Sequence, residues 1–429
     1  GDAIYPIAMN AVMARRFGID WMVTTDHGGP NHSKVHLNHA YPELLESREV
    51  VPEVIQFLGM EFDTPAADHT SLIFPQTDAE IQDLVQIEAT FNRRESWPVD
   101  PLRNTPSQML SALSAMKELS APPLLIAHHP SRSATAYRKY GMTTPREMRS
   151  WNDLAPKIAI GMEGAPGHQA IAQSRARFEP SKLTQFLGES RPRGIYGSAL
   201  GGYPTMGGFD QMTAVVGGFW DSMLGEGRRW WITANSDSHT HWSDGGADFW
   251  PGEYSKTYVF ALKTPDSIFA ALRAGRIFVV TGDLISSLEF RASTANRTAQ
   301  IGQSLSVQKG DDVKILMKIV EPSVANAGGF SPMVKRIDLI RGEIQATSSV
   351  DYNDENPRAR VESRFELDEP RKRGEPITLS LTVKNVQKSF YVRLRGTNTY
   401  EKEPLEDLDG EDPWNDLWFY SNPIFVETL

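Results

Sequence analysis

Five short apolar runs in the first 240 residues each lead into residues of the types that bind metal ions. The runs are residues 19–24, 54–60, 124–127, 158–162 and 231–234. The ligand-type residues that follow them are Asp26, His27, Glu61, His128, His129, Glu163, Asp237 and His239. A parallel α/β barrel gathers the residues just past its strand ends at one mouth, so this order predicts a metal site there.

Helices are predicted between these strands. Apolar residues recur at helical spacing in the segments 6–17, 106–119, 145–154 and 211–224. Alternation of strand and helix predicts a largely parallel sheet, and thus an α/β domain over residues 1–283. The glycine-rich stretch 194–218 lacks periodicity and is expected to be a loop over the site. The chain opens on a helix, so a closed barrel would require one more strand ahead of it.

Beyond residue 283 the hydrophobic pattern changes from helical spacing to period two. Apolar side chains alternate at 313–319, 377–383 and 390–394, and turn-forming stretches such as 351–357 separate the runs. This alternation is typical of half-buried antiparallel strands. Residues 284–429 are therefore predicted to form an all-β, immunoglobulin-like sandwich.

Composition excludes several classes of function. The net charge is −10 and no cluster of lysine or arginine stands out, which argues against a nucleic-acid partner. The chain has no apolar run long enough to span a bilayer. It has 0 cysteines, so any metal must be bound by imidazole and carboxylate groups.

Residue spacing orients several of the ligand candidates. Side chains two apart on an extended chain point the same way, so Asp237 and His239 are expected to face one ion. The same rule makes His128 and His129 point in opposite directions, and only His129 is expected to face the barrel mouth. Four other histidines are interpreted as solvated or supporting residues: His32, His36, His39 and His241.

Two further pairs of candidates depend on turns. His69 follows Glu61 by eight residues, and a tight turn would bring them together. A carboxylate such as Glu61 can bridge two divalent ions. Glu163 and His168 lie in a glycine-rich segment that is equally compatible with a ligand contact and with a plain turn.

Four strings at the predicted strand ends carry a family resemblance. They are Thr25-Asp26-His27, Gly59-Met60-Glu61 followed by His69, Ala127-His128-His129-Pro130 and Ser236-Asp237-Ser238-His239. In this order they resemble the PHP family, named for polymerase and histidinol phosphatase, over about residues 1–245. The resemblance implies a distorted seven-stranded (β/α) barrel, two or three divalent ions (zinc, manganese or iron) and metal-dependent hydrolysis of phosphoesters.

The resemblance also assigns roles to residues of this sequence. Glu61 would bridge two ions, and Asp237 would join it at one of them. The remaining ligands would form two pairs, His69 with His129 and His27 with His239. Glu61, Asp237 and His239 are therefore expected to be catalytic, with His128 and Asp26 supporting the ligands.

The chain departs from the family pattern at its front. The family's first strand carries a His-x-His pair, followed by an Asp or His, whereas this sequence begins at Gly1 and Asp2. Three metal ligands would be missing with that strand. Residues 271–282 and the predicted sandwich resemble a branch of exported PHP-like hydrolases that includes carbamate-ester hydrolases, and export of this protein is expected accordingly.

Three functions remain open from the sequence. The leading hypothesis is a phosphoesterase in which a metal-bound hydroxide attacks a small-molecule substrate. Arg132 and Lys139 would hold an anionic substrate, with Glu163 and His168 nearby, although both cations also suit a solvated loop. The second hypothesis is a carboxylic or carbamic ester hydrolase with an apolar pocket built from tryptophans 220, 230, 231, 242 and 250. The third is a non-catalytic binding protein with a degenerate barrel, and the oligomeric state is left open.

Overall fold

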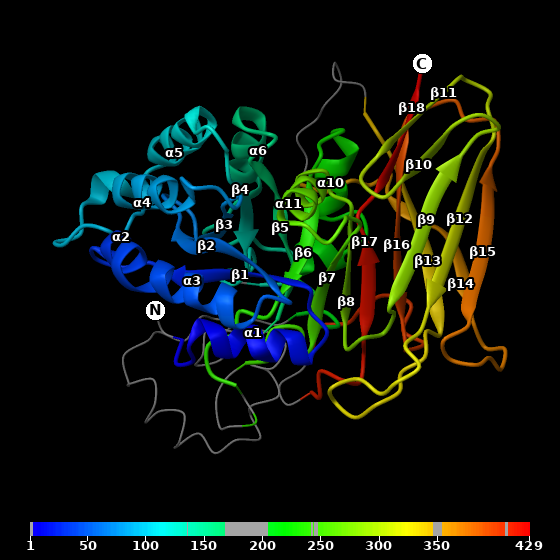
Figure 1. Ribbon diagram of the computed structural model, residues 1–429. Coiled ribbons are helices and arrows are strands. Elements are labelled where there is room, and N and C mark those ends of the chain that lie inside the picture. Colours follow the sequence, from blue (N-terminus) through cyan, green and yellow to red (C-terminus); the bar gives the residue numbers. More distant parts are fainter. Residues whose placement is uncertain are drawn as a thin grey trace.

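The structure is a computed structural model that describes residues 3–134, 136–167, 205–241, 243, 248–345, 354–407 and 411–429. It has an α/β part built from the first half of the chain and a β-rich part that holds most of the later strands (Figure 1). Residues 194–204 of the predicted loop lie outside the described residues, as do His168 and Trp242, and the described remainder of that loop, 205–218, includes the short helix Gln211–Ala214. Among the described helices, none is long and apolar enough to cross a bilayer.

The α/β part is organised around a curled, half-barrel sheet of six strands that follow one another in sequence order. Its strands are Trp21–His27 (β1), Ile55–Asp63 (β2), His69–Ile73 (β3), Leu124–His128 (β4), Ala159–Pro166 (β5) and Trp231–Asn235 (β6). The five strands predicted from apolar runs are confirmed. Neighbours are parallel except that β3 is antiparallel to both β2 and β4, so the sheet is mixed.

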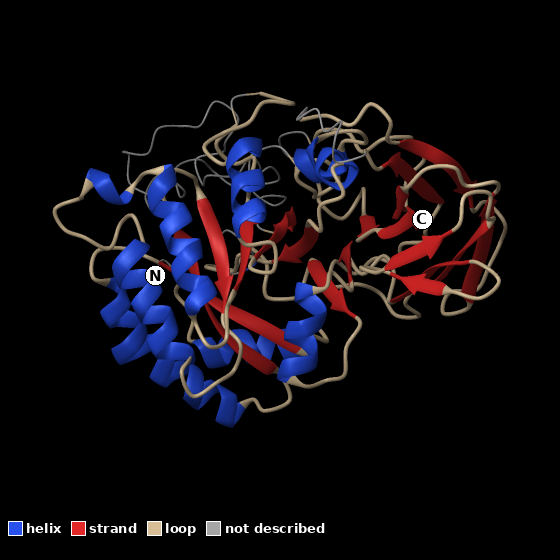
Figure 2. Cartoon of the chain, turned by 90° about the horizontal axis from the view of Figure 1, so that it is seen from above, coloured by secondary structure: helices blue, strands red, loops and turns tan. Residues whose placement is uncertain are grey.

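Helices cover the outside of this sheet (Figure 2). They are Ile7–Arg16 (α1), His32–Val35 (α2), the π-helical turn His36–Ala40 (η1), Tyr41–Val50 (α3), Glu80–Phe91 (α4), the short 3₁₀ turn Pro101–Arg103 (η2), Pro106–Glu118 (α5), Pro145–Leu154 (α6), Gln211–Ala214 (α9), Phe219–Gly225 (α10) and Pro265–Arg273 (α11). Local sequence explains sharp starts such as that of α6, where Thr144 and Glu147 form a reciprocal capping box.

The prediction of one helix over 211–224 is wrong. The structure has two short helices, α9 and α10, in this segment. Gly217 adopts a positive φ of 77°, and Gly218 precedes the first turn of α10 in an extended conformation. The two glycines therefore interrupt a helical hydrophobic pattern that continues on both sides of them.

The β-rich part contains two further sheets. Their strands are Ser255–Val259 (β7), Ile277–Thr281 (β8), Ser287–Ser293 (β9), Thr298–Gln300 (β10), Ser304–Val307 (β11), Val313–Val320 (β12), Arg336–Glu343 (β13), Arg360–Glu366 (β14), Pro376–Val383 (β15), Phe390–Thr397 (β16), Trp418–Ser421 (β17) and Ile424–Thr428 (β18). Four strands run in the order β10-β9-β12-β15, and the larger sheet contains β11-β18-β16-β17-β8-β7 with β13 and β14 beside β16.

The larger sheet continues across the domain boundary that the sequence predicted at residue 283. Strand β8 lies ahead of that boundary, yet it pairs antiparallel with β17. The core of the α/β part likewise includes Tyr391, Trp418 and Phe425 from the later strands. The two parts of the chain therefore share a buried interface.

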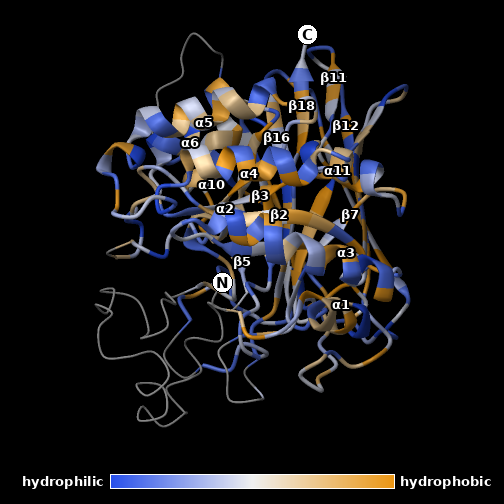
Figure 3. Ribbon diagram, turned by 60° about the vertical axis from the view of Figure 1, so that its left-hand side comes forward, coloured by the Kyte–Doolittle hydropathy of each residue, from blue (hydrophilic) through white to orange (hydrophobic). Residues whose placement is uncertain are grey.

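Burial within the strands follows the predicted alternation where one face is solvated. Val313, Ile315, Met317 and Ile319 on β12 are buried and alternate with more exposed residues. Strand β16 differs, because all of its residues are buried. It lies between the core of the β-rich part and helix α10, so both faces are covered. Figure 3 shows the hydrophobic colour along buried strands such as β2.

Candidate metal centre

Imidazole and carboxylate side chains gather at the ends of β1, β2, β4 and β6 and at the start of β3. A cavity of about 230 Å³ reaches them from the interior of the half-barrel and is lined by His27, Glu61, His128, Asp237 and His239, among others. The sheet produces this gathering because β1, β2, β4, β5 and β6 run in one direction and end at the same edge. Three overlapping groups of possible metal ligands can be distinguished here.

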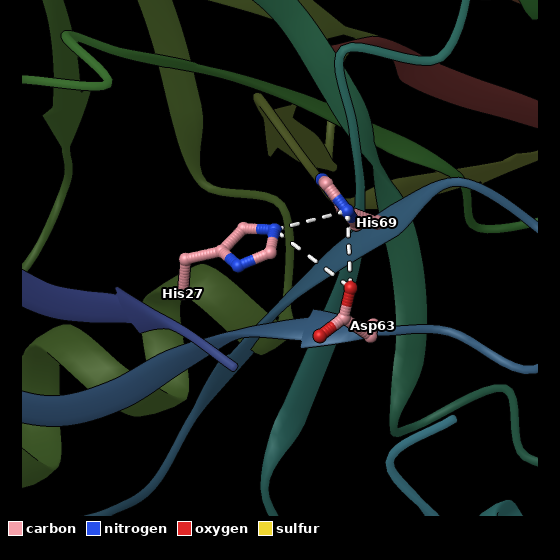
Figure 4. A group of neighbouring side chains, drawn as sticks. All are labelled: His27, Asp63 and His69. Atoms are coloured by element: carbon pink, nitrogen blue, oxygen red, sulfur yellow. Dashed lines mark hydrogen bonds and ion pairs between the residues drawn. The ribbon is translucent and has the colours of Figure 1, made fainter. Parts of the chain in front are cut away.

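The first group consists of His27, Asp63 and His69 (Figure 4). His27 Nε2 lies 3.1 Å from His69 Nε2 and 3.7 Å from Asp63 Oδ1, and His69 Nε2 lies 3.4 Å from the same oxygen. The other ring nitrogen of His27, Nδ1, is 2.9 Å from the carbonyl oxygen of Gly28. A carbonyl partner of this kind orients a histidine so that its Nε2 can act as a ligand.

Asp63 was missed in the sequence analysis. It stands two residues after Glu61 on β2, and it pairs with His69 across the β2–β3 hairpin. Its signal was available, because the same two-residue rule that joined Asp237 to His239 places Glu61 and Asp63 on one face. The apolar run was taken to end at Met60, whereas the strand continues to Asp63.

The second group consists of Glu61, His69 and His129. Glu61 Oε1 lies 2.5 Å from His69 Nδ1 and 3.3 Å from His129 Nε2, and the two histidine nitrogens are 3.4 Å apart. His69 thus offers Nδ1 to this group and Nε2 to the first. A neutral imidazole has one free lone pair, so it serves one of the two groups at a time.

The third group consists of Glu61, Asp237 and His239, whose ligand atoms lie within 4.8 Å of one another. His239 Nε2 is 3.8 Å from Asp237 Oδ1. His239 Nδ1 lies 2.6 Å from the carbonyl oxygen of Asp237 and 3.3 Å from Asp248 Oδ2, which directs Nε2 toward the group. Asp237 has a φ of 50°, so a turn and not an extended chain brings the two side chains together.

The expectation that only His129 faces the mouth is wrong. His128 Nδ1 and His129 Nε2 lie 3.4 and 3.3 Å from the same oxygen of Glu61, and the two rings stack with centroids 4.3 Å apart. Strand β4 ends at His128, and His129 has a φ of 28°. The strand rule of alternating faces stops applying at that residue, so consecutive side chains reach one site.

The other predicted site residues fall in different places. Glu163 is buried and accepts a hydrogen bond of 2.5 Å from the backbone N–H of His129. Asp26 lines the cavity. Arg132 contacts Asp68 through two nitrogens and lies 3.2 Å from His69 Nδ1, so its guanidinium is already engaged. Lys139 is exposed and does not line the cavity.

The tryptophans predicted to form an apolar pocket are core residues. Trp220, Trp230, Trp231 and Trp250 are buried, and none of them lines the cavity in the part of the chain that is described. Trp220 donates a hydrogen bond from Nε1 to the carbonyl of Trp230, and Trp231 donates one to Arg273. The indole nitrogens of Trp220 and Trp231 are therefore used in the scaffold.

Burial and charge act against each other throughout the cluster. Burial alone raises the pKa of Glu61, but the neighbouring His69 and His128 outweigh it and hold that pKa well below its usual value. Burial likewise lowers the pKa of His128, and Glu163, Asp237 and Glu61 together outweigh it, so the pKa is raised. Burial, Arg132 and His128 lower the pKa of His129 to about 3. Positive charge is thus favoured on His128 and disfavoured on His129.

Unpaired buried atoms test whether a cation fits these residues. Five atoms are buried without a hydrogen-bond partner among the described residues: both ring nitrogens of His128, Nδ1 of His129, Oδ2 of Asp63 and Oε1 of Glu163. Buried polar atoms are normally paired, so a cluster of such exceptions at one place calls for a missing ligand. Imidazole and carboxylate donors at these spacings suit zinc, manganese or iron. The residues therefore fit divalent ions.

Comparisons with known proteins leave the family of this chain open. No family model matches the sequence, and no curated protein matches it. A β-glucosidase from Listeria innocua, solved in complex with isofagomine, is similar at 12% sequence identity and a TM-score of 0.17, over 33% of this chain and 16% of that chain. A similarity this small supports neither a shared fold nor a shared function.

Proposed function

We propose that the protein is a metal-dependent hydrolase of the PHP family, acting on phosphoesters at a centre of two or three divalent ions. The observation that carries the proposal is the convergence of seven ligand-type side chains on one end of the half-barrel. These side chains are His27, Glu61, Asp63, His69, His129, Asp237 and His239. Among the described residues, buried atoms of two of them, Asp63 and His129, and of the adjacent His128 and Glu163 have no hydrogen-bond partner. A purely structural sheet gains nothing from burying so many unpaired polar atoms together.

Bound ions would supply a nucleophile from water at neutral pH and would neutralise charge on the ester group. The three overlapping groups name the residues that would hold them, with Glu61 shared between two groups and His69 shared between two. The chain orients these ligands through partners behind them. Gly28 positions His27, and Asp248 together with the Asp237 carbonyl positions His239.

A half-exposed arginine favours an anionic substrate. Arg94 Nη1 lies 3.5 Å from Asp63 Oδ1, and 52% of its side chain is exposed. It can therefore contact a ligand at the first group while staying tethered to it. Arg132, the cation chosen from the sequence, is held by Asp68 and positions His69 instead. A guanidinium pairs two oxygens of a phosphate, which an uncharged ester does not offer.

A second candidate function is hydrolysis of a carboxylic or carbamic ester at the same centre. The observation in its favour is the cavity lining, where Trp21, Ile73 and Ile126 adjoin the ligand groups. Apolar walls of this kind suit an uncharged substrate. The proposed architecture, a seven-stranded barrel followed by an immunoglobulin-like sandwich, is common to both candidates.

One experiment separates the candidates. The full chain is purified without chelators, its metal content is measured by plasma mass spectrometry, and hydrolysis of 4-nitrophenyl phosphate is compared with hydrolysis of a naphthyl ester. We expect two or three transition-metal equivalents and preferential hydrolysis of the phosphate. Preference for the naphthyl ester would select the second candidate. Less than half an equivalent of metal, with inertness toward both substrates after metal is added back, would leave a non-catalytic binding protein.

A further inference from the structure

A second group of buried ligand-type residues lies on α2, η1 and α4, and it shares no residue with the candidate metal centre. His32 on α2, His36 at the start of η1 and Glu88 on α4 are all buried. His32 Nδ1 lies 2.9 Å from Glu88 Oε1, and His36 Nδ1 lies 2.6 Å from Glu88 Oε2. The two imidazole rings meet edge to face with centroids 4.5 Å apart. His32 and His36 were interpreted as solvated or supporting residues, and their burial contradicts the first of these two interpretations.

The arrangement brings three ligand-type side chains to one place. Two imidazole nitrogens face two different oxygens of one carboxylate, and the three ligand groups lie within 4.8 Å of one another. The Glu88 carboxylate accepts from His36 Nδ1 and so favours a proton on that nitrogen, which a bound metal ion would replace, and among the described residues Nε2 has no hydrogen-bond partner. A π-helical turn begins at His36, and turns of this rare kind are frequent at functional sites.

We propose that His32, His36 and Glu88 bind one zinc ion, at a structural site distinct from the proposed catalytic centre. Two imidazoles and a bidentate carboxylate fill four coordination positions, the number that zinc takes in structural sites. With bonds of about 2.0–2.1 Å, tetrahedral ligand atoms lie about 3.3 Å apart. The present nitrogen–oxygen distances of 2.6 and 2.9 Å would widen by about half an ångström, which rotation of the side chains allows.

The proposed site connects the two segments that carry the first ligand group. His32 follows His27 by five residues, and Glu88 precedes Asn92, whose backbone N–H bonds to the Glu88 carbonyl. Arg93, the next residue, donates its backbone N–H to the carbonyl of Asp63. An ion between α2 and α4 would thus hold the neighbours of His27 and Asp63 in register.

The decisive measurement is anomalous scattering at the zinc absorption edge from crystals of the full chain grown with zinc chloride. We expect a peak between His32, His36 and Glu88, separate from any peak at Glu61. A map with zinc at the strand ends and none at this position would overturn the proposal. The measurement uses unaltered protein, so it does not depend on a variant that folds.

Matched variants add a second readout. Glu88→Gln keeps the shape of the side chain but removes the anionic bidentate ligand, and we expect it to lose one zinc equivalent per chain. Glu95→Gln is the control, because Glu95 accepts hydrogen bonds from Ser33 beside the group without belonging to it, and its zinc content should equal that of wild type. A folded Glu88→Gln protein with unchanged zinc content would contradict the site.

Glu61→Gln distinguishes this proposal from the proposed function. It should lose zinc from the strand ends and retain the equivalent held by His32, His36 and Glu88. Loss of every zinc equivalent in that variant would assign all of the metal to the strand ends, and the separate site would be wrong. If the wild-type protein binds zinc only at His32, His36 and Glu88, the proposed hydrolase function is contradicted.

Discussion

Two regions of this molecule bury charged side chains in opposite ways. Between β16 and α10, Arg393 places Nε and Nη2 at 2.8 and 2.7 Å from the two oxygens of Asp221, and both side chains are 0% exposed. The Tyr391 hydroxyl donates a third hydrogen bond of 2.8 Å to the same carboxylate. At the strand ends of the half-barrel, by contrast, neither ring nitrogen of His128 has a hydrogen-bond partner in the part of the chain that the structure describes.

The difference separates structural from functional burial of charge. A carboxylate that receives a bidentate arginine and a hydroxyl has its charge and its lone pairs matched within the chain. His128 Nδ1 and Nε2 each lie 3.4 Å from a carboxylate oxygen, of Glu61 and Glu163 respectively, without a hydrogen bond among the described residues, and a bound cation would complete this arrangement. The first arrangement should therefore matter for folding, and the second for binding and activity.

The largest effect is expected from Asp221→Ala. This substitution leaves the guanidinium of Arg393 buried without a counter-charge, which costs about 3–5 kcal/mol of unfolding free energy. Denaturant unfolding followed by circular dichroism measures the loss. The metal content of the protein that remains folded should not change. A loss of unfolding free energy below about 1 kcal/mol would show that the ion pair of Arg393 with Asp221 does not stabilise this interface.

Glu61→Gln should have the converse effect. It removes a carboxylate shared by two ligand groups, so we expect hydrolysis to fall at least about 100-fold, or about 2.7 kcal/mol in the activation barrier. The unfolding free energy of the metal-free protein should fall by less than in Asp221→Ala. Steady-state kinetics and denaturant unfolding on the same preparations test both statements. Full activity in this variant would contradict the functional role assigned to the charged residues at the strand ends.

A third carboxylate group sharpens the comparison through pH. Burial and the neighbouring Asp407 raise the pKa of Asp416 to about 9, and burial raises that of Asp407 to about 6, with Glu401 and Glu411 adding negative charge nearby. The folded protein therefore holds protons that the unfolded chain releases above pH of about 4. Stability contributed by these groups is present at low pH and is lost as pH rises toward 9.

Asp416→Asn tests whether stability falls as pH rises because of Asp416. The variant cannot ionise, so its unfolding free energy should fall less steeply between pH 5 and pH 9, by up to about 1.4 kcal/mol per pH unit. At pH 8 the melting temperature should exceed that of wild type by about 2–4 °C. Thermal unfolding across the pH series provides the measurement. Parallel curves for the two proteins would mean that Asp416 ionises normally in the folded state.

The smallest effect is expected at an exposed pair. Arg15 Nη1 lies 2.9 Å from Glu53 Oε1, but their side chains are 48% and 55% exposed. Water screens such a pair, so Arg15→Ala should change the unfolding free energy by no more than about 0.5 kcal/mol. A cost comparable to that of Asp221→Ala would remove burial as the explanation for the contrast between the regions.

Much of the candidate site was predictable because its residues sit where strands end. The five apolar runs became strands, and Glu61, His69, His129, Asp237 and His239 lie together as the spacing indicated. The omission of Asp63 and the wrong orientation expected for His128 share one cause. The sequence rules assumed where a strand stops, whereas β2 continues through Asp63 and the chain turns at His129.

The fate of the other polar residues required long-range packing. Arg132 is held by Asp68, which precedes it by 64 positions, and His36 is held by Glu88, which follows it by 52. Nothing in the local pattern around either residue names these partners. The pairing of β8 with β17 could not be predicted for the same reason, because hydrophobic alternation predicts that a segment is a strand but not which strand it pairs with.

The sequence by itself determined the local elements of this protein: the apolar runs that form strands, the capped helices, the period-two segments of the β-rich part and the ligand-type residues at strand ends. The tertiary structure decided which of these meet. It brought Asp63 beside His27 and His69, drew His128 and His129 to one carboxylate, and buried His32 and His36 against Glu88. Local periodicity depends on nearest neighbours along the chain, whereas a site depends on strand register and on helix packing between distant segments.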